Sequence, residues 1–301
     1  MFRLLSKESN IFSVPVYILF LLFIVIAFNV LNFNYLEGVS ATITFCGVAL
    51  CYFIFNQINL TYQTHLPLFL YTFFVFALYP GNLDIGIAVS LLTNSFLLLI
   101  LTSTDDDIRK KSYLLVGAIL AINYLFLATT WPMLIFVILH VIATSGRIGL
   151  NLFRLFFGMI LTFTAYFCVM YFIGYTTFDQ NYLPIPDSQF IKNYESLLFL
   201  VPVLGLMIYA VMDHFRYYNQ KSPTSRFKYT FLLIFILAQL VTIILYMGNH
   251  YEYLLLMTFP ASIILTRVLK FFPKYWMKET GLWLIILCLI LFKLSNYVQF
   301  F

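Results

Sequence analysis

Apolar runs of about twenty residues recur along the whole chain, and short polar connections separate them. An α-helix needs a run of roughly this length to cross about 30 Å of hydrocarbon, because each residue adds about 1.5 Å. We predict about eleven helical spans, at 11–32, 39–56, 66–79, 85–103, 112–128, 131–145, 150–174, 196–214, 229–247, 251–270 and 281–299. The pattern predicts an all-α fold, a polytopic transmembrane helical bundle.

Two pairs of predicted spans leave the count open. The connection between 39–56 and 66–79 carries no basic residue, and 131–145, which follows 112–128, is brief and begins beside Pro132. Either pair could be re-entrant instead of crossing the membrane. Removing a pair does not change the side on which the later loops lie, so the predicted orientation does not depend on the choice.

Composition excludes a water-soluble domain, because 62% of the 301 residues are hydrophobic and only 10% are charged. No linker-like stretch divides the chain, so residues 1–301 are predicted to form a single integral membrane domain. The four cysteines lie inside apolar runs without metal-ligand spacing, which favours a packing role. The sequence specifies no metal and no cofactor.

Lysine and arginine predict the orientation, because positive residues are retained on the cytoplasmic side during insertion. With a cytoplasmic N-terminus, the inner segments hold Arg3, Lys7, Arg109, Lys110, Lys111, Arg147, Arg154, Arg216, Lys221, Arg226, Lys228, Arg267, Lys270, Lys274 and Lys278. Only Lys192 and Lys293 fall on or near the outer side, and the C-terminus is predicted to lie outside. These positions explain the net charge of +5 without a nucleic-acid partner. The basic cytoplasmic loop 215–228 is expected to contact anionic membrane lipids.

Four polar residues lie inside predicted spans, namely Asn94, Asn123, His140 and Gln239. Unsatisfied polar groups are costly in hydrocarbon, so such residues normally face other helices. One hypothesis is interhelical hydrogen bonding, worth roughly 0.6–2 kcal/mol each. The alternative is a wet path in which His140 titrates as part of a proton relay.

The predicted outer surface is mostly acidic and carries Glu37, Asp84, Asp179, Asp187, Glu195 and Glu252, together with His250. The longest extracytoplasmic loop, 175–195, contains two prolines and cannot be one continuous helix. Its Asp179 and Asp187 could form a general acid/base pair or bind a divalent cation, or the loop could be a solvated connector. The turn with His250 and Glu252 could hold a phosphate or a sugar hydroxyl, or could be a polar turn in an aromatic belt.

Two segments carry a resemblance to a known family: FRLLSKESNIF at 2–12 and EYLLLMTFPASIILTRVL at 252–269. With the same span layout between them, they resemble an uncharacterised family of Bacteroidota inner-membrane proteins that is known as a domain of unknown function. The resemblance covers essentially the whole chain and implies a multi-pass protein of the bacterial inner (cytoplasmic) membrane. It implies no activity.

A second resemblance lies in two other stretches, from Lys111 through Tyr175 and from His250 to Arg267, the latter with a Tyr-Leu-Leu-x-x-x-Pro pattern. They resemble helices of the GT-C class of polyprenyl-phosphate-sugar-dependent glycosyltransferases. Those enzymes commonly place an acidic residue in the first outer loop, a position that Glu37 or Asp84 could occupy. This chain departs from them because it has no evident paired acidic motif and its outer loops are small.

These observations support three hypotheses of function. The first is a GT-C-like cell-envelope protein that handles a polyprenyl-linked glycan at the outer face, with Glu37 or Asp84 as the catalytic base. The residues that would orient the donor or its cation are Asp179, Asp187, His250 and Glu252. The second is a non-catalytic subunit or scaffold that binds envelope proteins. The third is a small-solute or proton-coupled transporter that uses the four mid-span polar residues.

Overall fold

The computed structural model describes residues 1–9, 12–30, 35–58, 60, 64–103, 112–174, 182–184, 195–248 and 250–296. The α-helices are α1 (Phe2–Leu5), α2 (Ser13–Asn29), α3 (Tyr35–Ile58), α4 (His65–Leu78), α5 (Ile85–Leu101), α7 (Tyr113–Phe126), α8 (Trp131–Thr144), α9 (Ile148–Ile173), α10 (Glu195–Leu198), α11 (Val201–Arg216), α12 (Pro223–Tyr246), α13 (Thr258–Phe271) and α14 (Tyr275–Ser295). The 3-10 helices are η1 (Ala128–Thr130), η3 (Tyr218–Gln220) and η4 (Tyr251–Met257). Over these ranges the all-α prediction is confirmed, and one isolated bridge joins Glu8 to Thr64.

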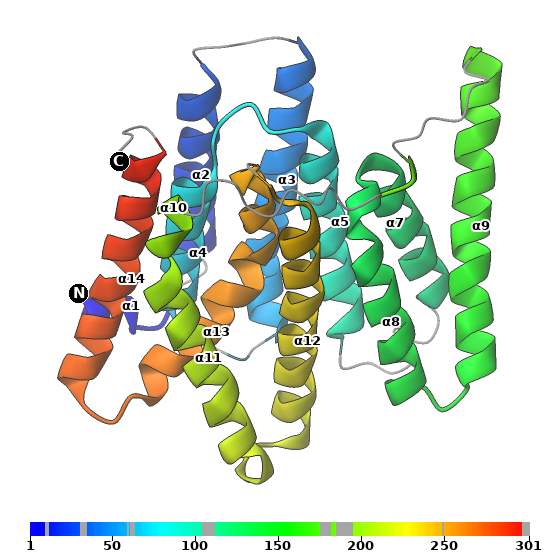
Figure 1. Cartoon of the computed structure of the whole chain (residues 1–301). Helices are drawn as coiled ribbons and strands as arrows, with labels where there is room; N and C mark the ends of the chain where they lie inside the picture. Colours follow the sequence, from blue (N-terminus) through cyan, green and yellow to red (C-terminus); the bar gives the residue numbers. More distant parts are fainter. Residues whose placement is uncertain are drawn as a thin grey trace.

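The long helices pack side by side, and successive ones run in alternating directions (Figure 1). Each predicted apolar segment coincides with helix, although some boundaries differ. Helix α12 begins before 229, at Pro223, because Ser222 caps it and proline suits a first helical position. Among the described residues, four helical segments are long and apolar enough to cross a membrane by length and composition: Tyr35–Phe55, Ile148–Ile173, Pro223–Tyr246 and Tyr251–Phe271.

Charges separate between the two ends of the bundle. At the end where α8 meets α9, α11 meets α12 and α13 meets α14, which we call the basic end, lie Arg3, Lys7, Arg147, Arg154, Arg216, Lys221, Arg226, Lys228, Arg267, Lys270, Lys274 and Lys278, with Glu8, Asp213 and Glu279. At the opposite or acidic end, where α4 meets α5 and α12 meets η4, lie Glu37, Asp84, Glu195 and Glu252. Among the described basic residues, Lys293 alone lies at the acidic end.

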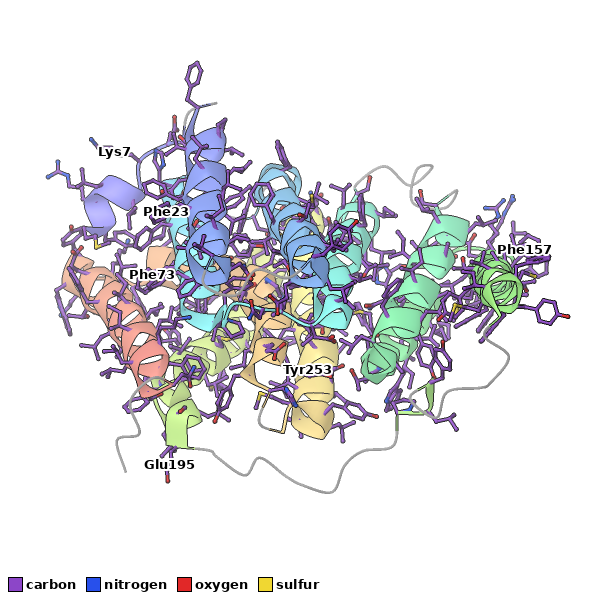
Figure 2. The ribbon with its side chains drawn as sticks, turned by 90° about the horizontal axis from the view of Figure 1, so that it is seen from above. Lys7, Phe23, Phe73, Phe157, Glu195 and Tyr253 are labelled. Atoms are coloured by element: carbon purple, nitrogen blue, oxygen red, sulfur yellow. The ribbon has the colours of Figure 1, made fainter. Side chains whose placement is uncertain are left out.

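Aromatic rings hold the centre of the bundle together. The ring of Phe55 on α3 lies 4.7 Å from that of Phe259 on α13 and 5.6 Å from that of Tyr71 on α4. The periphery is apolar as well: Phe157 on α9 lies at the rim when the bundle is viewed from the acidic end, whereas Tyr253 lies among the helices (Figure 2). So much exposed apolar surface requires a covering of hydrocarbon or protein.

Helices α7 and α9 cross at two glycines. A Cβ on Gly117 would lie 2.0 Å from the carbonyl oxygen of Leu155, and a Cβ on Gly158 would lie 2.1 Å from that of Leu114. Small residues allow such a close backbone approach, which is a common way to pack helices in lipid. The crossing is the main attachment of α9, because most other side chains of that helix are exposed or half-buried.

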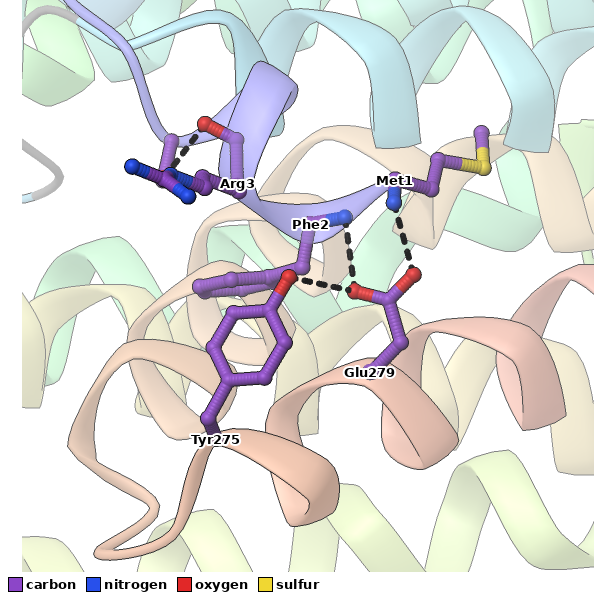
Figure 3. Close-up of polar contacts among 6 residues, drawn as sticks. Met1, Phe2, Arg3, Tyr275 and Glu279 are labelled. Atoms are coloured by element: carbon purple, nitrogen blue, oxygen red, sulfur yellow. Dashed lines mark hydrogen bonds and ion pairs between the residues drawn. The ribbon is translucent and has the colours of Figure 1, made fainter.

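The N-terminal segment is attached to the start of α14 at the basic end (Figure 3). The amino group of Met1 donates a hydrogen bond to Glu279 Oε1 at 2.7 Å, and the backbone N–H of Phe2 donates to Oε2 at 2.9 Å. The hydroxyl of Tyr275 donates to Oε2 at 3.3 Å. The hydrogen bond from the Met1 ammonium, above all, lowers the pKa of the Glu279 carboxyl.

Candidate functional site at the acidic end

The turn that joins α4 to α5 has an unusual backbone. Gly81 has a φ of +83° and Asn82 a φ of +42°, and Asn82 is the only described residue other than glycine with a positive φ. Left-handed backbone is disfavoured for residues with a Cβ, although asparagine adopts it more readily than most. Such strain persists where the surrounding structure enforces it, often at functional sites. The turn leads directly into Asp84, which precedes the first residue of α5.

Side chains from two other helices clamp this turn. On α2, Asn29 Oδ1 accepts a hydrogen bond from the backbone N–H of Asn82 at 3.0 Å, and Asn29 Nδ2 donates to the hydroxyl of Tyr79 at 2.6 Å. On α3, Ser40 Oγ donates to the carbonyl of Leu83 at 2.5 Å. The backbone that carries the Asp84 carboxylate is therefore fixed on both sides of the left-handed residues.

Lys293 on α14 supplies a third clamp. Its side chain is buried, and its ammonium donates to the carbonyl of Tyr79 at 2.5 Å and lies 4.1 Å from the centre of the Phe28 ring. A carbonyl oxygen and an aromatic face both attract a cation. The structure thus gives a local reason for the one described basic residue at this end.

Glu252 lies in η4, the 3-10 helix that leads into α13. Pro260 lies in the first turn of α13. Proline has no N–H to donate, and its ring disfavours a regular α-helical turn before it, so the segment that precedes α13 is a 3-10 helix. Among the described residues, Glu252 Oε2 is buried without a hydrogen-bond partner, while Oε1 lies 3.7 Å from Nδ1 of the exposed His250. Burial of a carboxylate oxygen without a hydrogen bond costs free energy, so Oε2 is placed to accept a hydrogen bond from a ligand.

Tyr253 lies where η4 packs against α5. Glu252 precedes it in η4, Asp84 directly precedes the first residue of α5, and the Tyr253 hydroxyl lies 3.3 Å from Thr129 Oγ1 on η1. Tyr253 itself is buried, whereas Asp84 is exposed at the N-terminus of α5. We call Asp84, Thr129, Glu252 and Tyr253 the Tyr253 cluster. It brings two acidic groups, a phenol and a hydroxyl from three separate segments to one place.

A short described part of the predicted outer loop is attached beside this cluster. Tyr124 donates a hydrogen bond to the carbonyl of Tyr182 at 2.6 Å, and Tyr246 donates to the carbonyl of Pro184 at 3.1 Å. The Tyr246 hydroxyl also accepts from Trp131 Nε1 at 2.7 Å. Aromatic side chains of α7, α8 and α12 thus hold residues 182–184 at the acidic end.

The structure places the sequence-predicted site residues as follows. Asp84 and Glu252 lie on two segments that pack against each other, the start of α5 and η4, and Glu37 lies in the first turn of α3, one turn before Ser40. His250 is exposed beside Glu252. Asp179 and Asp187 lie outside the described residues.

Sequence reasoning missed Asn82 and Thr129, and it placed Tyr253 in the outer turn with His250 and Glu252 without giving it a role in the site. The Pro-Gly-Asn sequence at 80–82 is a turn signal that could have drawn attention to Asn82. The chain has 22 tyrosines, and no sequence signal assigns Tyr253 a role that the other 21 lack.

The mid-span polar residues do not share one environment. Asn123 Oδ1 accepts a hydrogen bond from Ser90 Oγ at 2.6 Å between α7 and α5, and His140 packs its ring 4.9 Å from that of Phe231. Asn94 is buried with neither amide atom paired, and Gln239 Nε2 is also unpaired, within the described residues. The same part of the chain contains no group of three or more His, Cys, Asp or Glu suited to a metal ion.

An apolar groove of about 650 Å³ runs between α2 and α3 toward the acidic end. Its walls include Leu22, Ile26, Asn29, Tyr35, Val39 and Phe45. Asn29 therefore both lines this groove and holds the turn that carries Asp84. The groove and the turn are joined by one side chain.

Comparison with known proteins gives a family but no function. No curated protein and no solved structure matches the chain. A family match extends from residue 1 to residue 301 and therefore includes every element of the Tyr253 cluster. The chain belongs to the family of unknown function DUF6427.

Proposed function

We propose that this protein crosses the inner membrane of the cell envelope many times, with the basic end in the cytoplasm and the acidic end outside. Within the described part of the chain, four segments are long and apolar enough to cross a membrane, and successive helices alternate in direction, which supports the crossing. The separation of charge between the two ends supports the orientation. In this arrangement the Tyr253 cluster faces the outer side. The turn that carries Asp84 and the groove between α2 and α3 lie on the same, outer side.

The proposed activity is the handling of a lipid-linked glycan, in a GT-C-like manner, at the outer face. Asp84 accepts the proton of an acceptor hydroxyl, the hydroxyl oxygen bonds to the anomeric carbon, and the bond from that carbon to the polyprenyl phosphate breaks. The polyprenyl phosphate leaves as an anion. Glu252 and Tyr253 hold sugar hydroxyl groups, for which the unpaired Oε2 of Glu252 supplies an acceptor.

The groove between α2 and α3 supports a lipid-linked substrate. Its apolar walls suit an isoprenoid chain, since such a chain gains free energy when it leaves water for an apolar surface. Asn29 at the groove is hydrogen-bonded to the turn before Asp84. A chain seated there would keep its phosphate near the acidic end of the bundle.

The packing of η4, which carries Glu252 and Tyr253, against α5, which begins directly after Asp84, is the single observation that carries this proposal. The experiment compares Asp84→Asn and Glu252→Gln with Glu195→Gln, which removes an exposed carboxylate at the same end outside the cluster. Each variant replaces the wild-type gene, and lipid-linked glycans are quantified by mass spectrometry at equal protein levels. We expect the two cluster variants to accumulate unprocessed polyprenyl-linked sugar, whereas Glu195→Gln behaves like the wild type. Unchanged glycan profiles for both cluster variants would refute the proposal.

A scaffold role is the second candidate, and α9 is the observation that favours it. Only 6% of its apolar stretch is buried within the chain, and its exposed face carries Phe153, Phe157 and Phe172. As a scaffold, the protein should tolerate Asp84→Asn but lose a co-purifying membrane partner when these three phenylalanines are changed to leucine. Leucine keeps the face apolar, so lipid contact alone would not register the change.

A further inference from the structure

A second polar site lies at the opposite, basic end, far from the Tyr253 cluster. It is a pocket of about 790 Å³ whose walls include Tyr209, Asp213, Lys221, Ser222, Ser225 and Arg267. The residues come from α11, the connection after η3, the start of α12 and the end of α13. Segments far apart in the sequence therefore build one concave, polar surface.

Arg267 is the fixed cation of this pocket. It is only 8% exposed, and its guanidinium carbon lies 4.6 Å from the centre of the Tyr229 ring. Its Nη1 and Nη2 donate to Ser225 Oγ at 3.3 and 3.4 Å. Stacking and hydrogen bonding hold the guanidinium plane in one orientation, and a fixed guanidinium binds the oxygens of a phosphate with good geometry.

Lys221 brings a second cation to the same pocket. Its ammonium lies 3.3 Å from His214 Nδ1 and 5.7 Å from the centre of the Tyr229 ring, and its backbone carbonyl accepts from Arg226 Nε at 2.7 Å. Burial chiefly, and then the charge of Arg267, lower the pKa of Lys221, while Asp213 opposes the shift. The two cations repel each other, and one carboxylate on the wall offsets only one of their charges.

The N-terminus of α12 adds to the positive potential. Ser222, its N-cap, and Ser225, in its first turn, both line the pocket, and the helix is 24 residues long. Backbone N–H groups at a helix N-terminus carry partial positive charge and favour anions. Hydroxyl groups, a lysine, a buried arginine and a helix N-terminus thus face one space.

We propose that this pocket binds a phosphate group, either the headgroup of an anionic membrane lipid or a free phosphate ester. A phosphate would accept hydrogen bonds from Arg267, Lys221 and the serine hydroxyls. It would also relieve the repulsion between the two cations. This site is independent of the activity proposed for the acidic end, so each proposal can fail without the other.

The test uses the purified full-length chain and two probes. One arm measures retention of phosphatidylglycerol against phosphatidylcholine by native mass spectrometry from nanodiscs that contain both lipids. The other arm titrates inorganic pyrophosphate in detergent and follows the melting temperature. The variants are Arg267→Gln and Lys221→Gln, and the control is Lys274→Gln, which removes an exposed positive charge outside the pocket at the same end.

We expect the wild type to bind at least one probe, and both pocket variants to weaken that binding about tenfold, because each loses a charge-assisted hydrogen bond. Selective retention of phosphatidylglycerol identifies a lipid headgroup, and a response to pyrophosphate identifies a soluble phosphate. Lys221 is only half-buried, so Lys221→Gln remains informative if Arg267→Gln does not fold. Binding of neither probe, or an equal loss in Lys274→Gln, would overturn the proposal.

Discussion

Replacement of Gly117 by alanine tests the packing of α7 against α9. The added Cβ would lie 2.0 Å from the carbonyl oxygen of Leu155, whereas real Cβ contacts essentially never fall below 3.0 Å. The two backbones must therefore separate by at least 3.0 − 2.0 = 1.0 Å at this point. In Gly158→Ala the added Cβ would lie 2.1 Å from the carbonyl oxygen of Leu114, so the two backbones must separate there by at least 3.0 − 2.1 = 0.9 Å.

Overpacking of this kind typically costs about 1–3 kcal/mol, and we expect each substitution to lower the free energy of unfolding by that amount. The double variant should cost less than the sum of the two, because separation of the helices for one methyl group makes room for the other. Thermal unfolding of the purified chain in detergent, followed by near-ultraviolet circular dichroism, measures the effect.

The matched control is Gly205→Ala on α11, whose added Cβ has no neighbour within 4 Å. Alanine is a better helix former than glycine, so the control should be neutral or slightly stabilising. Equal melting temperatures for Gly117→Ala and Gly205→Ala would show that the α7–α9 crossing is looser than described. Strict additivity in the double variant would show that the two glycines do not share one crossing.

Asn29→Ala removes the two hydrogen bonds by which α2 holds the left-handed turn, and it should lower the free energy of unfolding by roughly 1–3 kcal/mol, since interhelical hydrogen bonds are worth about 0.6–1.7 kcal/mol each. The control is Thr42→Ala, which removes a hydrogen bond within α3 and should be near neutral in the same thermal assay. The pKa of Glu279 is lowered from 4.5, so its contact with the Met1 ammonium stabilises the fold at neutral pH and is lost as the pH falls through the lowered pKa. Below about pH 4.5, the melting temperature of the wild type should therefore drop more than that of Glu279→Gln. A reporter active only outside the cytoplasm should be active when fused after Phe301 and inactive when fused after Arg147, and the reverse result would contradict the proposed orientation.

The positions of the helices could be predicted from the sequence because they depend on local hydropathy. Boundaries that depend on capping differed: α14 begins at Tyr275 rather than 281, and the predicted loop 215–228 contains the first turns of α12. The 3-10 geometry of η4 was also missed, although Pro260 is visible in the sequence. Its effect depends on where the helix starts, which local hydropathy does not specify.

The candidate site could be predicted only in part, because its geometry is tertiary. Asp84 and Glu252 were both selected from the sequence as outer carboxylates, but the sequence offers no measure of their mutual distance. Tyr253 was assigned no role because a tyrosine near a span end is the common case in membrane proteins. Arg267 was likewise interpreted as one of many span-end charges, since neither its burial nor its stacking on Tyr229 is visible before folding.

Two of the buried cations, Lys293 and Arg267, show how a charge at the end of a helix can do more than set orientation. Lys293 lies at the acidic end, which the proposed orientation places outside, where lysine is disfavoured, yet it fixes the carbonyl of Tyr79 in the turn that carries Asp84. Arg267 lies at the basic end, which the proposed orientation places in the cytoplasm, where arginine is favoured, and orientation alone would be satisfied by an exposed side chain. Instead it is buried against Tyr229 and held by Ser225. Burial of a cation costs free energy unless the cation is well paired. In both places the contacts of the buried cation belong to a site, the turn before Asp84 for Lys293 and the basic-end pocket for Arg267, and these contacts account for its burial.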